Sequence, residues 1–391
     1  MDRRGAAGIL PPAWIRSLEI VASGGGALTL LGWVLDPGGA GSAWLVAALY
    51  VLGLGLGGLV FVAFAYLTRA GWSVAFRRVP EGFAATLPLG ALFPVLALVF
   101  LPWLYPWSDA AVVASSHVLQ GKSAWLTPWF FRLRAVVYLL IWLLFALAIL
   151  RTSRRQDVTG GVAATRRNTR LSAAFLVVFA ITFSLASFDW IMSLEPHWYS
   201  TVFAIYNFSG LFVSGLAGIV IVAIVLRRRG PLEGILRPGH LHDLGKLLLG
   251  FTTFWAYIWF SQFMLIWYGN IPEETAYFTL RQEGAWSLLM LVNVAINWGL
   301  PFLVLLSRAT KRSETVLLRV CALLLVGRWL DLYLMVAPPH APDGPRPTLW
   351  DVTALATALA LFVLVLFRVL SRTPVVPRGD PLLEESLRHR T

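Results

Sequence analysis

Apolar residues occur in long runs along this chain, each close to the length that a helix needs to cross a bilayer. A transmembrane helix takes about 20 predominantly apolar residues. By this measure we predict ten spans, at residues 17–35, 43–68, 83–105, 132–151, 172–192, 199–226, 246–268, 284–307, 316–337 and 349–371. The pattern predicts an all-α integral membrane protein. A polar N-terminus (residues 1–16) and a polar tail (residues 372–391) flank its membrane domain (residues 17–371).

Lys and Arg residues separate between alternate connections of this pattern. Most of the 32 lie in the two terminal segments and in the connections at 69–78, 151–170, 227–246 and 308–312. Lys122, Arg132, Arg134, Arg281 and Arg346 lie on the other side. Because loops rich in Lys and Arg stay in the cytoplasm, we predict that both termini are cytoplasmic. The net charge of +12 is then a signal of topology, with some attraction to anionic lipid, and does not indicate nucleic-acid binding.

The first span is open to a second interpretation. Arg3 and Arg4 precede an apolar run and a segment of small residues, which is also typical of a signal peptide. Glu19 and the length of the run favour a span that is retained.

Composition supports a membrane protein and argues against a bound redox centre. The chain is 58% hydrophobic and 13% charged, whereas soluble proteins are about half apolar and about a quarter charged. A single cysteine, Cys321, excludes a disulfide framework and a Cys-ligated iron–sulfur or zinc site. None of the six histidines lies deep in a span, which argues against a haem within the bundle. We therefore expect no haem, iron–sulfur or metal ligands, and leave a quinone or quinol as the candidate ligand.

The chain also carries a loose internal repeat. Four spans that run outward end in aromatic residues next to acids, at FLPWLYPWSD (100–109), SFDWIMSLE (187–195), LIWYGNIPEE (265–274) and GRWLDLYLMVAPP (327–339). This repeat predicts two four-helix bundles, at about 43–192 and 199–337, with a flanking helix on each side. An aromatic belt at the membrane surface is the alternative explanation for the Trp residues. The glycine run GLGLGG (53–58) lies within a span and favours close helix packing over a phosphate loop.

The segment between the fifth and sixth spans holds the first candidate site. Asp189, Glu195 and His197 lie among aromatic residues at a predicted membrane surface. Ionisable residues at such positions often mark function. Asp189 is either a carboxylate that faces water or a proton acceptor with a raised pKa, and His197 is a candidate general base. Glu195 and His197 are expected to be solvated because they lie in the turn.

A second candidate lies in the ninth span. Arg328 and Asp331 are three residues apart and so share one helical face. Arg328 falls near the middle of the membrane, where a charge needs a partner, and Asp331 or Asp189 could provide it. An ion pair that only joins helices is an equally good explanation.

Polar residues also form stripes along other spans. The seventh span carries Thr253, Tyr257, Ser261 and Tyr268 at helical spacing, with Gln262 beside them and Glu273 just outside. Asn207 recurs with other polar residues on the sixth span, and Asn293 and Asn297 lie one turn apart on the eighth. Such stripes more often join helices than conduct protons, but together they could supply a proton path.

Three segments resemble a known family. FDWIMSLEPHWYSTVF (188–203), WAYIWFSQFMLIWYGNIPEET (255–275) and NWGLPFLVLLSRATKR (297–312) are similar to the second quinone-binding-type membrane subunit of alternative complex III, in the NrfD-like (polysulfide-reductase) group. The resemblance covers roughly residues 15–372. It implies ten helices around two four-helix bundles, in a bacterial inner-membrane complex that transfers electrons from quinol to cytochrome c or another high-potential acceptor. It also implies as partners a paralogous membrane subunit, an external iron–sulfur subunit and haem c subunits.

The resemblance leads to one functional prediction and two alternatives. We expect a cofactor-free membrane subunit that contributes a quinone-like pocket near the outer surface, a proton path, or both. The resemblance implies that the residues of this pocket or path in the matching motifs are Asp189, Glu195, His197, Tyr268, Glu273 and Asp331. A subunit that only anchors the complex, without quinone, and a secondary transporter are the alternatives.

Overall fold

The computed structural model describes residues 10–389, and these residues form helices and connecting turns without a strand. The predicted all-α class is therefore confirmed. The basic residues Arg3, Arg4 and Arg390, which entered the topology prediction, lie outside the described part. The long helices are α1 (Pro12–Leu35), α2 (Pro37–Leu67), α8 (Pro128–Thr159), α9 (Val162–Trp190), α10 (Phe203–Arg228), α11 (Pro238–Gly269), α16 (Glu314–Val336) and α17 (Leu349–Ser371).

Two further spans are built from shorter pieces. The third consists of α3 (Arg78–Ala84), α4 (Leu87–Ala97), the 3-10 turn η2 (Leu98–Phe100) and α5 (Leu101–Leu104). Pro94 lies inside α4 and Pro102 follows η2, and proline removes a helical hydrogen bond and bends the helix. The eighth consists of α13 (Gly284–Val294), the π-helical turn η5 (Ala295–Gly299) and α14 (Leu300–Leu305).

Short helices connect the spans at their ends. They are η1 (Gly71–Phe76), η3 (Pro106–Ser108), α6 (Ala110–Ser115), α7 (His117–Lys122), η4 (Met192–Leu194), α12 (Pro272–Gln282), α15 (Arg308–Arg312), η6 (Pro338–His340) and α18 (Leu383–Arg388).

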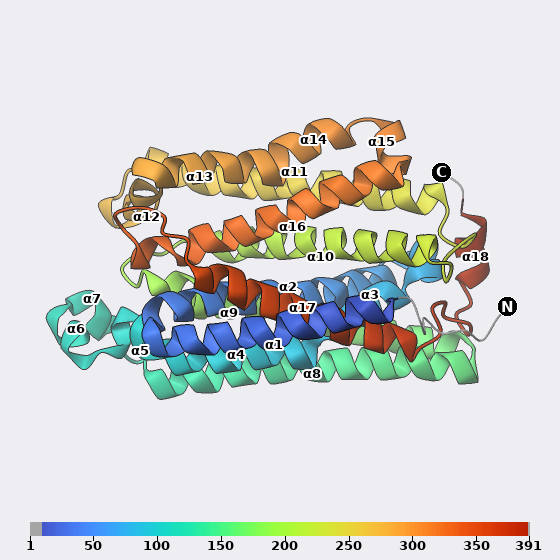
Figure 1. The fold of residues 1–391 in the computed structure, drawn as a ribbon, viewed down its shortest axis with the longest axis horizontal. Helices are drawn as coiled ribbons and strands as arrows, with labels where there is room; N and C mark the ends of the chain where they lie inside the picture. Colours follow the sequence, from blue (N-terminus) through green and yellow to red (C-terminus); the bar gives the residue numbers. More distant parts are fainter. Residues whose placement is uncertain (1–9, 390–391) are drawn as a thin grey trace.

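Nine helical segments within residues 10–389 are long and apolar enough to cross a membrane. The remaining predicted span, the ninth in chain order, is α16, which has the length but also carries Glu314, Arg319, Arg328 and Asp331. It nevertheless lies among the other long helices (Figure 1). The chain is a multi-pass membrane protein by the length and composition of its helices.

The long helices lie side by side in two groups (Figure 1). In the first group α2 contacts α4 and α9, and α9 contacts α8. In the second group α10 contacts both α11 and α16, and α13 contacts α16. Helices α1 and α17 flank the two groups, packed on each other and on α2. This arrangement matches the expected pair of four-helix bundles with flanking helices.

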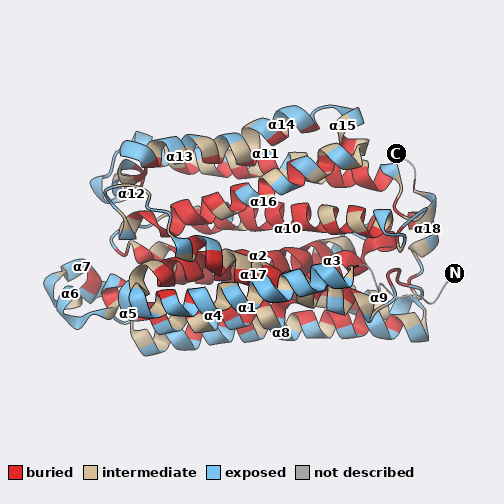
Figure 2. Cartoon of the chain, viewed as in Figure 1, coloured by how far each residue is buried: buried red, intermediate tan, exposed pale blue. Residues whose placement is uncertain are grey.

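The two groups meet where α2 crosses α10, and these are the most buried of the long helices (Figure 2). Their backbones approach closely at Gly57 and Gly215, where a Cβ on either glycine would lie 2.8 Å from the Cα of the other. On the next residue, Gly58, a Cβ would meet the side chain of Phe83 in α3. The glycine run therefore serves close helix packing, as the sequence predicted.

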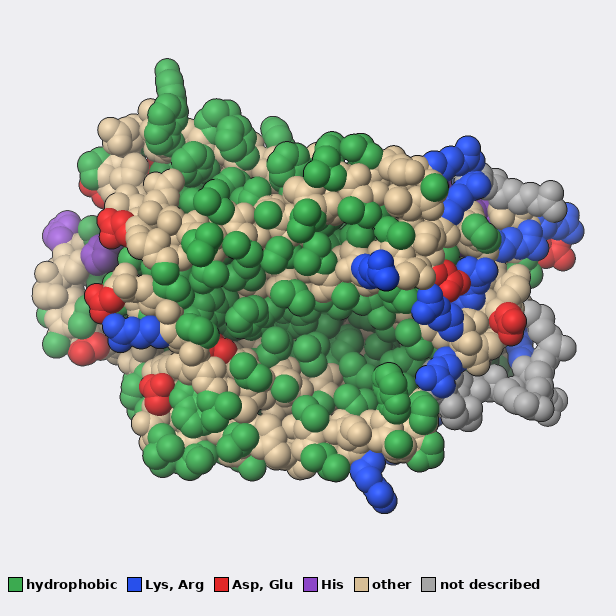
Figure 3. All heavy atoms as spheres, turned by 45° about the horizontal axis from the view of Figure 1, so that its top comes forward, with side chains coloured by type: hydrophobic (Ala, Val, Ile, Leu, Met, Phe, Trp, Pro, Cys, Tyr) green, Lys and Arg blue, Asp and Glu red, His purple; other side chains and the backbone are tan. Residues whose placement is uncertain are grey.

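The two ends of the molecule differ in charge. Figure 3 shows blue Lys and Arg side chains gathered mainly at one end, an apolar band across the middle, and several acidic and histidine side chains at the other end. We call the first the basic end; it includes Arg77, Arg166 and Arg228. Both ends of the described chain lie there, whereas α6, α7 and α12 lie at the opposite end (Figure 1).

The C-terminal tail is folded onto the basic end. The Ser386 hydroxyl in α18 donates to the carbonyl of Trp72 at 2.6 Å and accepts from the backbone N–H of Ala75 at 2.9 Å. His389 lies 2.5 Å from the carboxylate of Asp243 in α11. These contacts fasten residues that lie more than 100 positions apart in the sequence.

Candidate functional site

The three ionisable residues between α9 and α10 do not form one site. Asp189 is buried, Glu195 is paired with a distant arginine, and His197 is exposed. The alternative in which Asp189 faces water, and the expectation that Glu195 is solvated, were wrong. The reason is the same for both: each carboxylate meets a buried arginine from another helix.

Asp189 lies at the end of α9 and is only 1% exposed. Its Oδ1 atom accepts from Arg134 Nη2 at 2.8 Å, and its Oδ2 atom accepts from Arg134 Nε at 2.9 Å. Trp125 Nε1 donates to Oδ1 at 2.8 Å, and the Tyr138 hydroxyl donates to Oδ2 at 3.1 Å. Because one arginine binds both oxygens and two further donors complete the set, this carboxylate fits a structural ion pair better than a proton acceptor for a ligand.

Glu195 lies at the end opposite the basic end and pairs with Arg281 of α12, with Oε1 and Nη2 2.7 Å apart. Arg281 also donates to the carbonyls of Leu334 at 2.8 Å and Tyr277 at 2.9 Å. Burial lowers the pKa of the Arg281 guanidinium, but Glu195 and Tyr277 outweigh this effect and the net shift is upward. Burial raises the pKa of the Tyr277 phenol to about 12. Arg281 therefore stays protonated, and its contacts join the α9–α10 connection to α12 and α16.

A second cluster centres on Asp331, which is fully buried. Its carboxylate accepts from Arg328 Nη1 at 2.7 Å, from Asn293 Nδ2 at 3.2 Å, and from the Tyr206 hydroxyl. Trp255 Nε1 completes the cluster at 3.4 Å. The four helical segments α10, α11, α13 and α16 each contribute, so the predicted Arg328–Asp331 pair is confirmed and lies where the second bundle converges.

Arg328 connects this cluster to the first bundle. Its Nη2 atom donates to Asn207 Oδ1 at 2.6 Å, and Asn207 Nδ2 donates to the hydroxyl of Ser187 in α9 at 3.0 Å. Asp189, the other partner considered for Arg328, is held by Arg134 instead. Gly210 makes room for the guanidinium, because a Cβ at this position would overlap Arg328 Nη1 and approach Asp331 Oδ2.

Two small cavities flank the Arg328–Asp331 pair. One has a volume of about 20 Å³, and Tyr206, Gln262, Arg281 and Asn293 contribute to its wall. The other is also about 20 Å³, with Ser187, Asn207 and Arg328 in its wall. Each is large enough for one water molecule and too small for a quinone ring. Gln262 is 3% exposed, and its Oε1 atom accepts no hydrogen bond from the residues described, so the first cavity has an unused acceptor in its wall.

The polar stripe of α11 points away from this site. Tyr257 is 64% exposed and Tyr268 is 84% exposed, and Thr253 is also exposed. Ser261 is half-buried, and Glu273 lies exposed beyond the helix end. Of the predicted α11 residues, only Gln262 faces the interior. The stripe therefore does not form an internal proton path within this chain.

The eighth span contains a feature that the sequence prediction missed. The π-helical turn η5 includes Asn297, whose Nδ2 atom donates to Asn293 Oδ1 at 2.7 Å and to the carbonyl of Gly327 at 3.1 Å. Pro301 follows this turn and lacks the N–H group that a regular helix would use. The π-helical turn and Asn297 hold Asn293 beside Asp331, and such turns are frequent at functional sites.

Arg134, Arg281 and Tyr206 were not selected from the sequence, although they hold the three acids. Arg134 and Arg281 did carry a signal. Both belong to the small set of basic residues on the side that is poor in them. A cation that departs from the positive-inside pattern needs a reason, and here each of the two arginines is buried against a carboxylate.

No group of three or more His, Cys, Asp or Glu residues able to hold a metal ion occurs within residues 10–389. A comparison with models of known protein families found no match, and a comparison with curated proteins found none either. The resemblance to the alternative complex III subunit therefore remains a prediction that rests on the three sequence segments.

Proposed function

We propose that this chain is a membrane subunit of a quinol-oxidising respiratory complex of the alternative complex III type, and that it provides a proton path past Asp331. In this proposal it binds no haem or iron–sulfur cluster, and its electrons pass through partner subunits. The observation that carries the proposal is a fully buried carboxylate at the convergence of four helical segments, with two small cavities whose walls include side chains that bind Asp331 or Arg328. Intramembrane carboxylates of this kind are typical of proton relays.

The path would connect the end opposite the basic end with the middle of the bundle. Glu195 and Arg281 lie near its outer entrance, and Gln262 and Asn293 line the cavity between Arg281 and Asp331. A water in this cavity could bridge Gln262 Oε1 and the groups around Asp331. Asn207 and Ser187 extend the polar contacts into the first bundle.

The geometry favours the proton-path role over the quinone-pocket role. A site for a ring-sized ligand has a volume of several hundred Å³, whereas the cavity next to Asp331 measures about 20 Å³. Two of the three predicted bases are held in ion pairs, Asp189 with Arg134 and Glu195 with Arg281. His197 is then the one predicted base without an ion pair among the described residues. A quinol site would then belong mainly to the paralogous subunit.

The test uses the assembled complex in liposomes, with quinol oxidation and proton movement measured together. We expect Asp331→Asn and Gln262→Leu to reduce the protons moved per electron, and to slow any turnover coupled to them by about tenfold or more. The matched controls Asp343→Asn and Tyr257→Phe change exposed groups outside the path and should have no effect.

Each outcome separates the alternatives. An unchanged proton yield in an assembled Gln262→Leu complex would reject the path and favour an anchor subunit. Isolation of the chain as a stable protein that takes up a solute, without haem or iron–sulfur partners, would favour a secondary transporter.

A further inference from the structure

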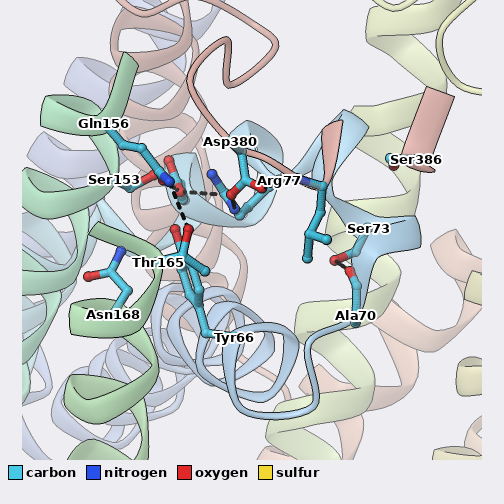
Figure 4. Close-up of polar contacts among 12 residues, drawn as sticks. Tyr66, Ala70, Ser73, Arg77, Ser153, Gln156, Thr165, Asn168, Asp380 and Ser386 are labelled. Carbon is cyan, nitrogen blue, oxygen red and sulfur yellow. Dashed lines mark hydrogen bonds and ion pairs between the residues drawn. The ribbon is translucent and has the colours of Figure 1, made fainter. Parts of the chain in front are cut away.

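A pocket of about 530 Å³ opens at the basic end, far from the cluster around Asp331. Its walls come from the end of α2, η1 and the residue after it, the first turns of α9, and the tail next to Asp380. Figure 4 shows how Tyr66, Arg77, Thr165 and Asp380 lie around it, each from a different segment. Its size is in the range of small-molecule sites, and the proposed function does not use it.

The pocket wall is strongly cationic. Arg69, Arg77, Arg166 and Arg170 contribute to it, and Asp380 is the acid among its described lining residues. Arg77 Nη1 is 2.5 Å from Asp380 Oδ2, and Arg77 Nε is 3.3 Å from Glu81 Oε1, so two carboxylates already balance the charge of Arg77. Within residues 10–389 no carboxylate forms an ion pair with the other three arginines. The wall therefore carries three cations that no carboxylate of the described residues pairs with.

Arg77 is a buried, fixed part of the pocket wall. It is 3% exposed, and Tyr66 lies beneath it, with the guanidinium carbon 4.9 Å from the ring centre. Arg77 Nη2 makes no hydrogen bond with the part of the chain that the structure describes. Thr165 adds a hydroxyl group that accepts from Gln156, whereas the hydroxyls of Ser73 and Thr169 already donate to backbone carbonyls. Guanidinium and hydroxyl groups together are the donors that bind phosphate oxygens.

The position of the pocket points to a lipid. Helix α2 ends at Leu67, and the apolar part of α9 begins just after Arg170, so the arginines lie where the apolar band gives way to the basic end. Exposed apolar residues, Leu67 and Val162, lie beside it. Basic pockets between transmembrane helices on the cytoplasmic side bind anionic headgroups. We propose that this pocket binds the phosphate headgroup of an anionic phospholipid, whose acyl chains run along the apolar surface of the helices.

A neighbouring pocket of about 840 Å³, between α8 and α9, is the alternative site for the headgroup. Its arginines are Arg151, Arg154, Arg155 and Arg167, and all four are exposed. The Arg77 pocket has instead a buried arginine in its wall. The open Nη2 donor of Arg77 is already fixed in place, which spares a ligand the entropy that ordering an exposed side chain costs, so the headgroup is assigned to the Arg77 pocket.

The experiment measures binding of phosphatidylglycerol to the full-length chain in detergent by native mass spectrometry. Arg166 and Arg170 lie one helical turn apart, and both are exposed and unpaired, so their replacement leaves the fold intact. We expect Arg166→Gln/Arg170→Gln to weaken binding of phosphatidylglycerol roughly tenfold. The matched control Arg229→Gln/Arg308→Gln removes the same charge from exposed positions of the basic end outside the pocket and should bind as the unmodified chain does.

Three results would overturn the proposal. If the two double variants bind phosphatidylglycerol equally, the pocket is not the binding site. If the chain binds phosphatidylcholine as tightly as phosphatidylglycerol, it has no preference for an anionic headgroup. Displacement of the lipid by millimolar inorganic phosphate would reassign the pocket to a soluble phosphate compound. The melting temperature in phosphatidylcholine nanodiscs, expected to be unchanged in both variants, shows that any loss of binding is not a loss of folding.

Discussion

At the scale of single residues, the two buried acids of the candidate site follow one pattern, in which each meets an arginine and further donors. Asp189 meets Arg134, and Asp331 meets Arg328. The two clusters differ in what surrounds them. Four donors contact each carboxylate, but Arg134 binds both oxygens of Asp189, whereas Arg328 binds one oxygen of Asp331. Tyr206 and Asn293, which contact Asp331, also line a small cavity. In the proposed function the first cluster is structural and the second takes part in proton movement.

The structural role of Asp189 predicts a large effect on stability. Asp189→Asn leaves the Arg134 guanidinium buried without its counterion, which costs about 3–5 kcal/mol. Thermal unfolding of the chain in detergent should show this loss. The double variant Arg134→Gln/Asp189→Asn removes both charges, so it should lose less stability than the two single changes together. Additive losses would mean that the interaction between Arg134 and Asp189 contributes no stability.

The space for Arg328 depends on a single glycine. Gly210→Ala places a methyl group where the Arg328 guanidinium now lies, so we expect a loss of stability of about 1–3 kcal/mol. Gly250→Ala in α11 is the matched control. A Cβ there meets no atom within 4 Å, and the change should be neutral or slightly stabilising. Chemical unfolding in mixed micelles would compare the two, and equal stabilities would contradict the steric argument.

At the scale of elements, the sequence predicted what depends on local pattern. The long apolar runs gave the helices, and Arg328 and Asp331 pair across one turn of a single helix. Arg134–Asp189 and Arg281–Glu195 join residues 55 and 86 positions apart, and no local pattern specifies such contacts. The stripe on α11 shows a different limit. Helical spacing identifies a polar face, but lipid and the protein interior are both apolar, so spacing alone does not say which one that face meets.

The contact between α2 and α10 gives a prediction at this scale. Gly57→Ala places its Cβ 2.8 Å from the Gly215 Cα, and backbone atoms on a central helix move only if the helices separate. We expect a loss of about 1–3 kcal/mol in unfolding free energy. Gly53→Ala lies one turn earlier on the same helix, where a Cβ meets Leu211 at an ordinary 3.7 Å, and it should fold as stably as the unmodified chain. A similar loss at Gly53 would show that glycine content, and not the close approach, matters.

At the scale of the whole molecule, charge and the chain ends agree on one orientation. The described chain begins and ends at the basic end (Figure 1), and the opposite end holds α6, α7 and α12. Ten long segments return the chain to the side where it began. From the positive-inside rule we predict that the basic end faces the cytoplasm. This orientation would also place the pocket lined by Arg77 in the leaflet where anionic lipids attract cationic side chains.

Labelling of single cysteines tests this orientation directly. The native Cys321 is fully buried, so the unmodified chain should not react with a membrane-impermeant maleimide. His197→Cys and Arg229→Cys each replace an exposed residue, one at either end of the molecule. In intact cells we expect His197→Cys to react and Arg229→Cys to react only after the membrane is permeabilised. The reverse pattern would invert the topology, and it would place the entrance near Glu195 on the cytoplasmic side. A proton path past Asp331 would then begin at the opposite face of the membrane, and the arginine pocket would meet the outer leaflet, so this measurement decides the direction of both proposals.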